Sequence, residues 1–167
     1  RTGDRIDEQT VEKVSTAEAF FRAQRLAVNF LSYRPRSSKE VLNHMRKKGY
    51  SPDLGRKVIQ HLLKFGMIND EEFARMFVRD RVKRKPVGKA WLRQALQEKG
   101  ISPPLVEKVF TEYISDEDQQ KAAEEIALRR LRLASATFEK LNANRKRKRL
   151  LEYLLRRGFS TDIAMAT

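Results

Sequence analysis

A segment of twelve residues occurs twice in this chain, 51 positions apart, and this repetition limits the possible folds more than any other feature. KKGYSPDLGRKV, at 47–58, aligns with EKGISPPLVEKV, at 98–109, with Gly, Ser, Pro, Leu, Lys and Val at matching places. A looser third copy is LEYLLRRGFSTDI, at 151–163. Such a period predicts tandem copies of one small unit, each burying its apolar face against a neighbour.

Within each copy, apolar residues recur at the spacing of one face of an α-helix. Ser followed three residues later by Glu predicts helix starts at Ser15 and Ser37, while Gly49 and Gly100 predict helix ends. No stretch alternates apolar and polar residues as a half-buried strand would. We therefore expect an all-α fold, an elongated array of three tandem three-helix repeats. The predicted segments are a leader at 1–14 and repeats at 15–68, 69–114 and 115–167.

Composition limits the compartment and the kind of partner. The chain has 167 residues, no Cys and a formal net charge of +14. The lack of Cys excludes disulfides and fits a reducing compartment. No apolar run approaches the roughly 18 residues of a membrane span, and RTGDRIDEQT at the N-terminus lacks a signal-peptide core. We expect a cytoplasmic monomer without membrane contact, and the charge predicts a polyanionic or acidic partner.

The residue patterns of common catalytic sites do not occur in the sequence. It contains neither GxGxxG nor GxxxxGK[ST], which cradle phosphates, nor the GxSxG of hydrolases. His44 and His61 fall on different predicted helices without neighbouring Cys, so a packing role is favoured over metal binding. The acidic triplets at 70–72 and 116–118 are more consistent with first helical turns, where carboxylates face free N–H groups, than with metal sites. We expect no enzyme, no cofactor and no metal.

Aromatic residues beside basic ones raise the possibility of base stacking. Trp91 falls one position off the apolar stripe of its predicted helix, and Tyr33 and Tyr50 also neighbour Lys or Arg. Such rings can stack on nucleobases. A partly buried packing role is the commoner outcome and is favoured here.

Positive charge is segregated along the chain. Residues 34–99 carry 18 Lys or Arg and 7 Asp or Glu, and residues 129–157 carry 11 and 2, whereas residues 107–125 carry 2 and 7. Five cations end the helix before Pro86, more than the one or two that a helix dipole stabilises. Five more, at 145–149, stand at a helix start, where the dipole disfavours them. A binding partner explains these runs better than solvation does.

The stretch LKFGMINDEEFARMFVRDR, at 63–81, followed by GKAWLRQALQEKGI, at 88–101, resembles the core of the RecX family, regulators of the RecA recombinase. YRPRSSKEVLNHMRKKGY, at 33–50, resembles that family's first repeat. The resemblance extends from about Phe20 to Gly158 and departs in the leader and the third repeat. It implies a non-enzymatic regulator that lies along the groove of the RecA–single-stranded DNA filament and inhibits recombinase ATPase and strand exchange, in control of recombination and DNA repair.

The alternative is a basic helical nucleic-acid-binding module. Its repeats would track phosphates, and any effect on a recombinase would come from competition for single-stranded DNA. In both cases we expect the basic clusters to contact the recombinase filament or the DNA strand. The predicted contact residues are Arg34, Arg36, Arg79, Arg81, Lys83, Arg84, Lys85, Lys89, Arg93, Arg145, Lys146, Arg147, Lys148, Arg149, Arg156 and Arg157.

Overall fold

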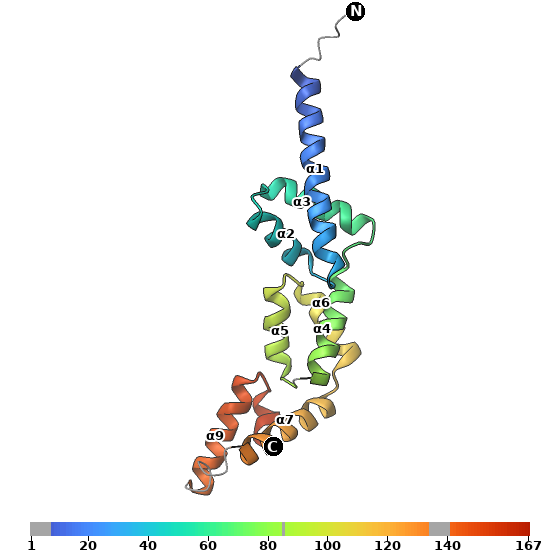
Figure 1. Ribbon diagram of the computed structural model, residues 1–167. Helices are drawn as coiled ribbons and strands as arrows, with labels where there is room; N and C mark the ends of the chain where they lie inside the picture. The colour runs from blue at the N-terminus through green and yellow to red at the C-terminus, as the bar shows by residue number, and fades with distance from the viewer. Residues whose placement is uncertain (1–7, 85, 134–140) are drawn as a thin grey trace, which may run out of the picture. The chain divides into compact units, whose positions relative to one another are not determined.

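All regular elements in the described part of the chain are α-helices, as the sequence predicted (Figure 1). The computed structural model describes residues 8–84, 86–133 and 141–167, with side chains from Val14 onward. Within these ranges no helix combines the length and the apolar character needed to cross a membrane. The helices are α1 (Glu8–Ser32), α2 (Ser38–Lys47), α3 (Pro52–Lys64), α4 (Asp70–Arg84), α5 (Lys89–Glu98), α6 (Pro103–Tyr113), α7 (Asp116–Leu133), α9 (Ala143–Arg156) and α10 (Thr161–Ala166).

The first compact unit ends at Asp70, and its helices α1, α2 and α3 surround one hydrophobic core. The small side chain of Ala23 on α1 is fully buried, which lets the other two helices approach closely. Met45 of α2 and Leu62 of α3 are also fully buried and fill the centre of the core. All buried members of this core lie within the first predicted repeat, 15–68.

The second compact unit, Glu71–Thr167, contains two hydrophobic cores. α4, α5 and α6 surround the first core, to which the fully buried Leu92 belongs. α7, α9 and α10 surround the second core, to which Leu154 belongs. The buried members of each core come from a single predicted repeat, 69–114 or 115–167. Among the described residues, each of the three cores is thus surrounded by three helices.

The second helix of each repeat ends on a glycine in the left-handed region. The φ angles of Gly49, Gly100 and Gly158 are 86°, 83° and 83°. At the first of these ends, the N–H of Tyr50 donates to the carbonyl of Met45 at 3.2 Å, and the corresponding bond recurs at the other two ends. Only glycine adopts this backbone conformation at little cost, which explains why the glycine of the sequence repeat recurs.

Two helix starts differ from the sequence prediction. α1 begins at Glu8, within the segment assigned to a leader, so Ser15 is an interior helical residue rather than an N-cap. Glu18, expected to complete a capping box, forms an ion pair with Arg22 instead. Residues 8–14 include good helix formers and no Gly or Pro, so nothing local stops the helix at Ser15. The capping box of Ser37 and Glu40, in contrast, forms as predicted.

The two repeats of the second unit are joined end to end through helix termini. Gly88, the N-cap of α5, offers no side chain to its own helix. Its N–H donates to the carbonyl of Arg157 at 2.9 Å, and the N–H of Ala90 donates to the carbonyl of Gly158 at 3.1 Å. The free N–H groups at the start of α5 thus bind the free carbonyls at the end of α9, and the two opposite dipole ends meet.

A buried glutamine completes this joint. Gln119 of α7 is 3% exposed, and its Oε1 accepts the N–H of Lys89 at 2.9 Å. Its Nε2 donates to the carbonyl of Val87 at 3.4 Å. A Cβ added to Gly88 would lie 1.9 Å from the backbone of Gly158, so only glycine permits this approach.

We predict that Gly88→Ala destabilises the second unit by about 1–3 kcal/mol, because the added methyl group forces the two backbones apart and weakens the joint. Urea unfolding followed by the fluorescence of Trp91, the chain's single Trp, measures the effect. Gln97→Ala is the matched control, since it alters an exposed side chain of the same helix and should change stability by less than about 0.5 kcal/mol. Equal midpoints for the two variants would contradict the tight contact.

Candidate partner-binding surface

Four of the predicted contact cations form ion pairs with carboxylates of the chain. The pairs are Arg34 with Glu40 (3.3 Å), Arg84 with Asp80 (2.8 Å), Lys89 with Asp116 (2.9 Å) and Arg93 with Glu107 (2.8 Å). The Arg93 guanidinium contacts Glu107 through two nitrogens, at 2.8 and 3.2 Å. These hydrogen bonds lower the pKa of Glu107 and raise the pKa of Arg93. Arg93 thus links α5 to α6 within its own repeat.

A second ion-pair network, absent from the sequence prediction, links α4 to α6. Arg75 binds Glu112 at 2.8 Å and also pairs with Glu71, which Lys108 contacts at 2.8 Å. Hydrogen bonds from these cations lower the pKa of both carboxyls, the one from Lys108 acting most strongly on Glu71 and the one from Arg75 on Glu112. Glu71 belongs to the acidic triplet at 70–72, so this carboxylate joins two helices besides standing in a first turn.

The first acid of that triplet also has a specific contact. Oδ1 of Asp70 accepts the N–H of Ser38 at 2.8 Å, at the start of α2. In the second triplet, Asp118 completes a capping box with Ser115. Its side chain accepts the N–H of Ser115 at 3.2 Å, and the hydroxyl of Ser115 accepts the N–H of Asp118 at 3.0 Å. Throughout the described residues, no group of three His, Asp or Glu side chains is placed to hold a metal ion.

Aromatic rings orient another group of cations. The guanidinium of Arg81 lies 4.9 Å from the ring centre of Trp91, which packs against the core of its repeat. The packing role predicted for Trp91 is therefore confirmed. Arg36 lies 4.1 Å from the ring centre of Phe30, whose other neighbour is the stacked ring of His44 at 4.0 Å. Burial, reinforced by nearby cations, lowers the pKa of His44, which favours the neutral ring in this stack.

The remaining aromatic candidates and His61 lie in the first unit. Tyr50 packs against its hydrophobic core, in agreement with a packing role, whereas Tyr33 is 84% exposed. His61 lies between two rings, at 5.6 Å from Phe20 and 4.6 Å from Phe65. Both histidines of the chain thus contact aromatic rings.

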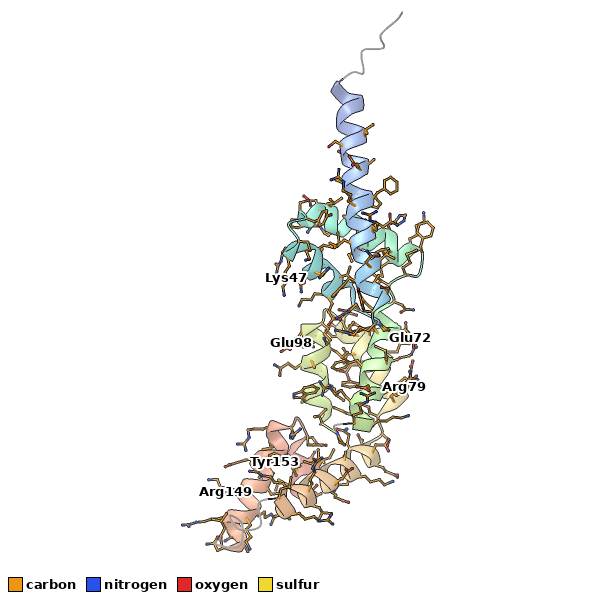
Figure 2. All side chains as sticks on the ribbon, in the orientation of Figure 1. Lys47, Glu72, Arg79, Glu98, Arg149 and Tyr153 are labelled. Carbon is orange, nitrogen blue, oxygen red and sulfur yellow. The ribbon has the colours of Figure 1, made fainter. Side chains whose placement is uncertain are left out.

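A third group of predicted cations has no carboxylate partner within the described residues. Five of them occupy the first two turns of α9, whose N-cap Asn142 accepts the N–H of Arg145 at 2.9 Å. Figure 2 shows basic side chains projecting along this helix, Arg149 among them. The predicted cations that have neither a carboxylate nor an aromatic ring as partner in the described residues are Arg79, Lys83, Arg145, Lys146, Arg147, Lys148, Arg149 and Arg156. Lys85 lies outside the described residues.

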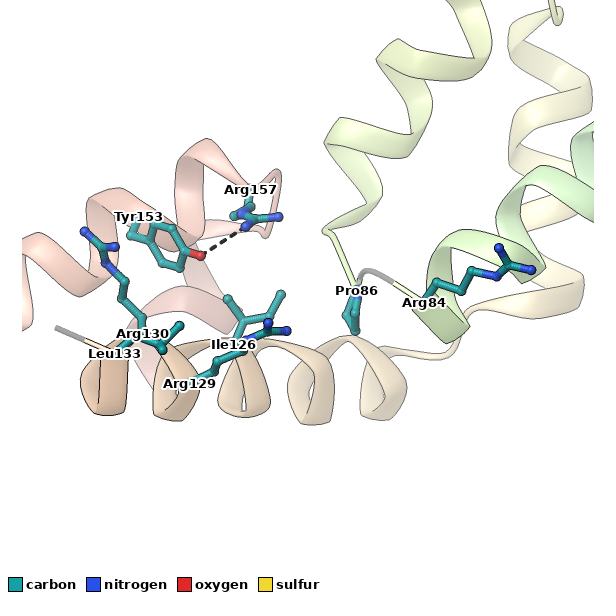
Figure 3. A pocket seen from close by; sticks show the side chains of 8 residues that line it. All are labelled: Arg84, Pro86, Ile126, Arg129, Arg130, Leu133, Tyr153 and Arg157. Atoms are coloured by element: carbon teal, nitrogen blue, oxygen red, sulfur yellow. Dashed lines mark hydrogen bonds between the residues drawn. The ribbon is translucent and has the colours of Figure 1, made fainter.

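Arg157 belongs to a pocket of about 340 Å³ that sequence patterns did not predict (Figure 3). Its Nη2 donates to the hydroxyl of Tyr153 at 3.1 Å. The guanidinium of Arg130 lies 5.2 Å from the centre of the same ring. Arg129 and Arg84 also line the pocket, the first from α7 and the second from the end of α4. The basic run at 129–132 was a sequence signal for Arg129 and Arg130, but only folding brings them beside α9.

Two family models match the chain. The second three-helix domain of RecX matches residues 69–109, and the first three-helix domain of RecX matches residues 23–62. The matched segments lie in different predicted repeats, and each contains the repeated Gly-x-Ser-Pro segment of its repeat. Each matched family domain is, by its description, a unit of three helices.

Curated relatives and solved structures extend the similarity over most of the chain. The regulatory protein RecX of Listeria monocytogenes is 27% identical over 98% of this chain and 59% of its own length, and that of Bacillus licheniformis is 29% identical over 99% and 61%. The chain thus spans about three fifths of the length of these relatives.

A crystal structure of RecX from Lactobacillus salivarius has a TM-score of 0.76, with 27% identity over 89% of this chain and 93% of that one. A crystal structure of regulatory protein RecX has a TM-score of 0.86 over 98% and 78% of the two chains, and at 21% identity it supports the fold alone.

The lowered pKa values predict how acid acts on the second unit. Because the pKa values of Glu107 and Glu112 lie below the ordinary 4.5, these carboxylates stabilise the fold above about pH 4.5 and lose that effect as pH falls through their folded-state values. We expect the thermal midpoint to fall between about pH 5 and pH 3. Arg75→Met should be less stable at pH 7 and lose less on acidification. Arg79→Met, on the exposed side of α4, serves as the control; acid sensitivity unchanged in Arg75→Met would refute the assignment.

Proposed function

Because the chain belongs to the RecX family, we propose that it is a non-enzymatic regulator that binds the RecA–single-stranded DNA filament and inhibits recombinase ATPase and strand exchange. In this proposal the protein acts as a cytoplasmic monomer in the control of recombination and DNA repair. The lack of Cys is compatible with that reducing environment. An array of repeats that reaches more than one recombinase subunit remains part of the proposal.

The observation that carries the proposal is the run of cations in the first two turns of α9. Arg145, Arg147 and Arg149 are exposed, and within the described residues they have no carboxylate partner. Positive charges at a helix N-terminus oppose the dipole, so the run costs stability when the protein is alone. An acidic protein surface or the phosphates of a bound strand would remove that cost, which favours a partner at this helix.

The contacts made by the histidines and by three carboxylates support a role without catalysis. The two histidines pack against aromatic rings. The carboxylates of Glu71, Glu107 and Glu112 are committed to arginines or lysines that join helices. Groups held in this way stabilise the repeats. Regulation by binding requires a charged surface and a rigid scaffold, both of which this chain supplies.

The same α9 cations also fit a nucleic-acid-binding module that competes for single-stranded DNA. Direct phosphate contacts release counterions, so binding to free DNA should weaken steeply with salt. Binding to the assembled filament should instead require recombinase and resist competition by added DNA. The two functions therefore differ in an experiment that varies DNA while recombinase is held constant.

The test is the DNA-dependent ATPase activity of a RecA-type recombinase preassembled on single-stranded DNA and titrated with this protein. Inhibition at well below one molecule per recombinase, unaffected by excess DNA, supports direct action on the filament. Inhibition that disappears when DNA is added in excess favours the competing nucleic-acid module instead. Absence of inhibition in both conditions would refute both functions.

We predict that reversing three charges of α9, in the variant Arg147→Glu, Lys148→Glu and Arg149→Glu, raises the concentration for half-maximal inhibition at least about tenfold, because three attractive contacts become repulsive. The matched control is Arg25→Glu, Lys57→Glu and Lys64→Glu, which makes the same change in net charge at exposed positions of the first unit. Circular dichroism checks that both variants remain helical. Equal inhibition by the two variants would remove α9 from the contact surface.

A further inference from the structure

The pocket between α7 and α9 contains basic side chains and no carboxylate among its lining residues. Figure 3 shows Tyr153 with Arg157 on one side of its ring and Arg130 on the other, while Arg129 extends from α7 between Arg130 and Pro86 along the helix. The Arg84 guanidinium is 79% exposed and already pairs with Asp80 at 2.8 Å. The cations that remain for a ligand are therefore Arg129, Arg130 and Arg157.

Tyr153 orients Arg130 and Arg157 without neutralising them. The guanidiniums of Arg130 and Arg157 lie 5.2 and 5.4 Å from its ring centre, and Arg157 also donates one hydrogen bond to its hydroxyl at 3.1 Å. A guanidinium has five N–H donors, so most remain available after these contacts. Arg75 and Arg93 elsewhere in this unit are held by carboxylates, which cancel their charge. Arg130 and Arg157 are thus positioned by the tyrosine, and within the described residues no carboxylate pairs with them.

Helix dipoles alone do not account for this cluster. Cations near the ends of α7 and α9 are favoured by the carbonyl ends, but the effect is weak and local. At α9 the carbonyls of Arg157 and Gly158 already accept N–H groups from the start of α5. Because these carbonyls are already hydrogen-bonded, the helix dipole stabilises the charge of Arg157 only weakly. It also gives no reason for three guanidiniums to share one cavity against their mutual repulsion. An anionic ligand gives that reason.

We propose that this pocket is a phosphate-binding site in which Arg129 and Arg157 are the main ligands and Arg130 adds positive charge across the tyrosine ring. Arginine matches phosphate well, because its planar fork donates two parallel hydrogen bonds to two phosphate oxygens. A cavity of about 340 Å³ has room for a phosphate or pyrophosphate group. The source of the group is a phosphodiester of single-stranded DNA, a step that rests on the proposed function, or free phosphate, which shares the chemistry.

The proposal is tested on the full chain in the absence of recombinase. Fluorescence anisotropy with labelled oligothymidylate measures strand binding, and isothermal titration calorimetry measures inorganic pyrophosphate binding. The variant Arg129→Gln with Arg157→Gln removes the two main ligands. The variant Arg25→Gln with Lys57→Gln is the matched control, because it removes two exposed cations that neither line the pocket nor belong to the predicted contact residues. Circular dichroism and Trp91 fluorescence verify folding.

We expect the pocket variant to weaken pyrophosphate binding at least about tenfold and to lower the salt slope of strand binding by about one or two, while the control retains pyrophosphate affinity. Tyr153→Phe, which keeps the ring and removes the hydroxyl that Arg157 contacts, should give a smaller loss. Pyrophosphate that displaces the oligonucleotide identifies the strand as the source, and binding without displacement identifies free phosphate. Equal losses in the pocket and control variants, or no pyrophosphate binding by the wild type, would overturn the site.

These outcomes are separate from those of the proposed function. A chain that inhibits the recombinase filament but binds no pyrophosphate retains the proposed function and loses the phosphate site. A chain that binds pyrophosphate through Arg129 and Arg157 but does not inhibit the filament retains the site and loses the proposed function.

Discussion

The direct contact between the start of α5 and the end of α9 is the constraint on which the second unit depends. Helix termini leave N–H and carbonyl groups unsatisfied, and here each end supplies what the other lacks. Gly88 allows the approach because it has no side chain, and Gln119 fills the remaining donor and acceptor positions. Since Arg157 and Tyr153 belong to the same end of α9, the joint also fixes where the basic pocket lies relative to α7.

The cations of this chain are distinguished by what holds them rather than by their number. Carboxylates hold Arg75 and Arg93, and these pairs connect helices within a repeat. Aromatic rings contact Arg81 and Arg157 and orient these side chains without pairing their charge with a carboxylate. In the described part of the chain, neither kind of partner contacts the exposed run on α9. A sequence of such high net charge can therefore combine ion pairs that join its helices with a cationic surface open to the anionic partner that we propose.

Local spacing predicted the features that depend on local interactions. The capping box at Ser37 and the glycine-terminated helix ends follow from residues a few positions apart, and both were predicted correctly. The network around Arg75 and the role of Gln119 were missed, because their partners lie 30 or more positions away in sequence. The start of α1 was misplaced, since a Ser-x-x-Glu pattern can also occur inside a helix. Predicting the pocket would have required knowing that α7 and α9 are neighbours.

The unsatisfied N–H groups at the start of the middle helix obtain their acceptors differently in the first and second repeats. α2 is capped by Ser37 and Glu40, its own neighbours in sequence. α5 takes its acceptors from Arg157 and Gly158, near the end of the chain. During synthesis on the ribosome, the start of α2 is complete once Asp70 has followed the first repeat, whereas the start of α5 keeps exposed N–H groups until Gly158 has been made. Ser37 and Gly88 occupy equivalent N-cap positions, 51 residues apart. Which of the two residues stands there thus decides how late in translation the start of the middle helix is completed.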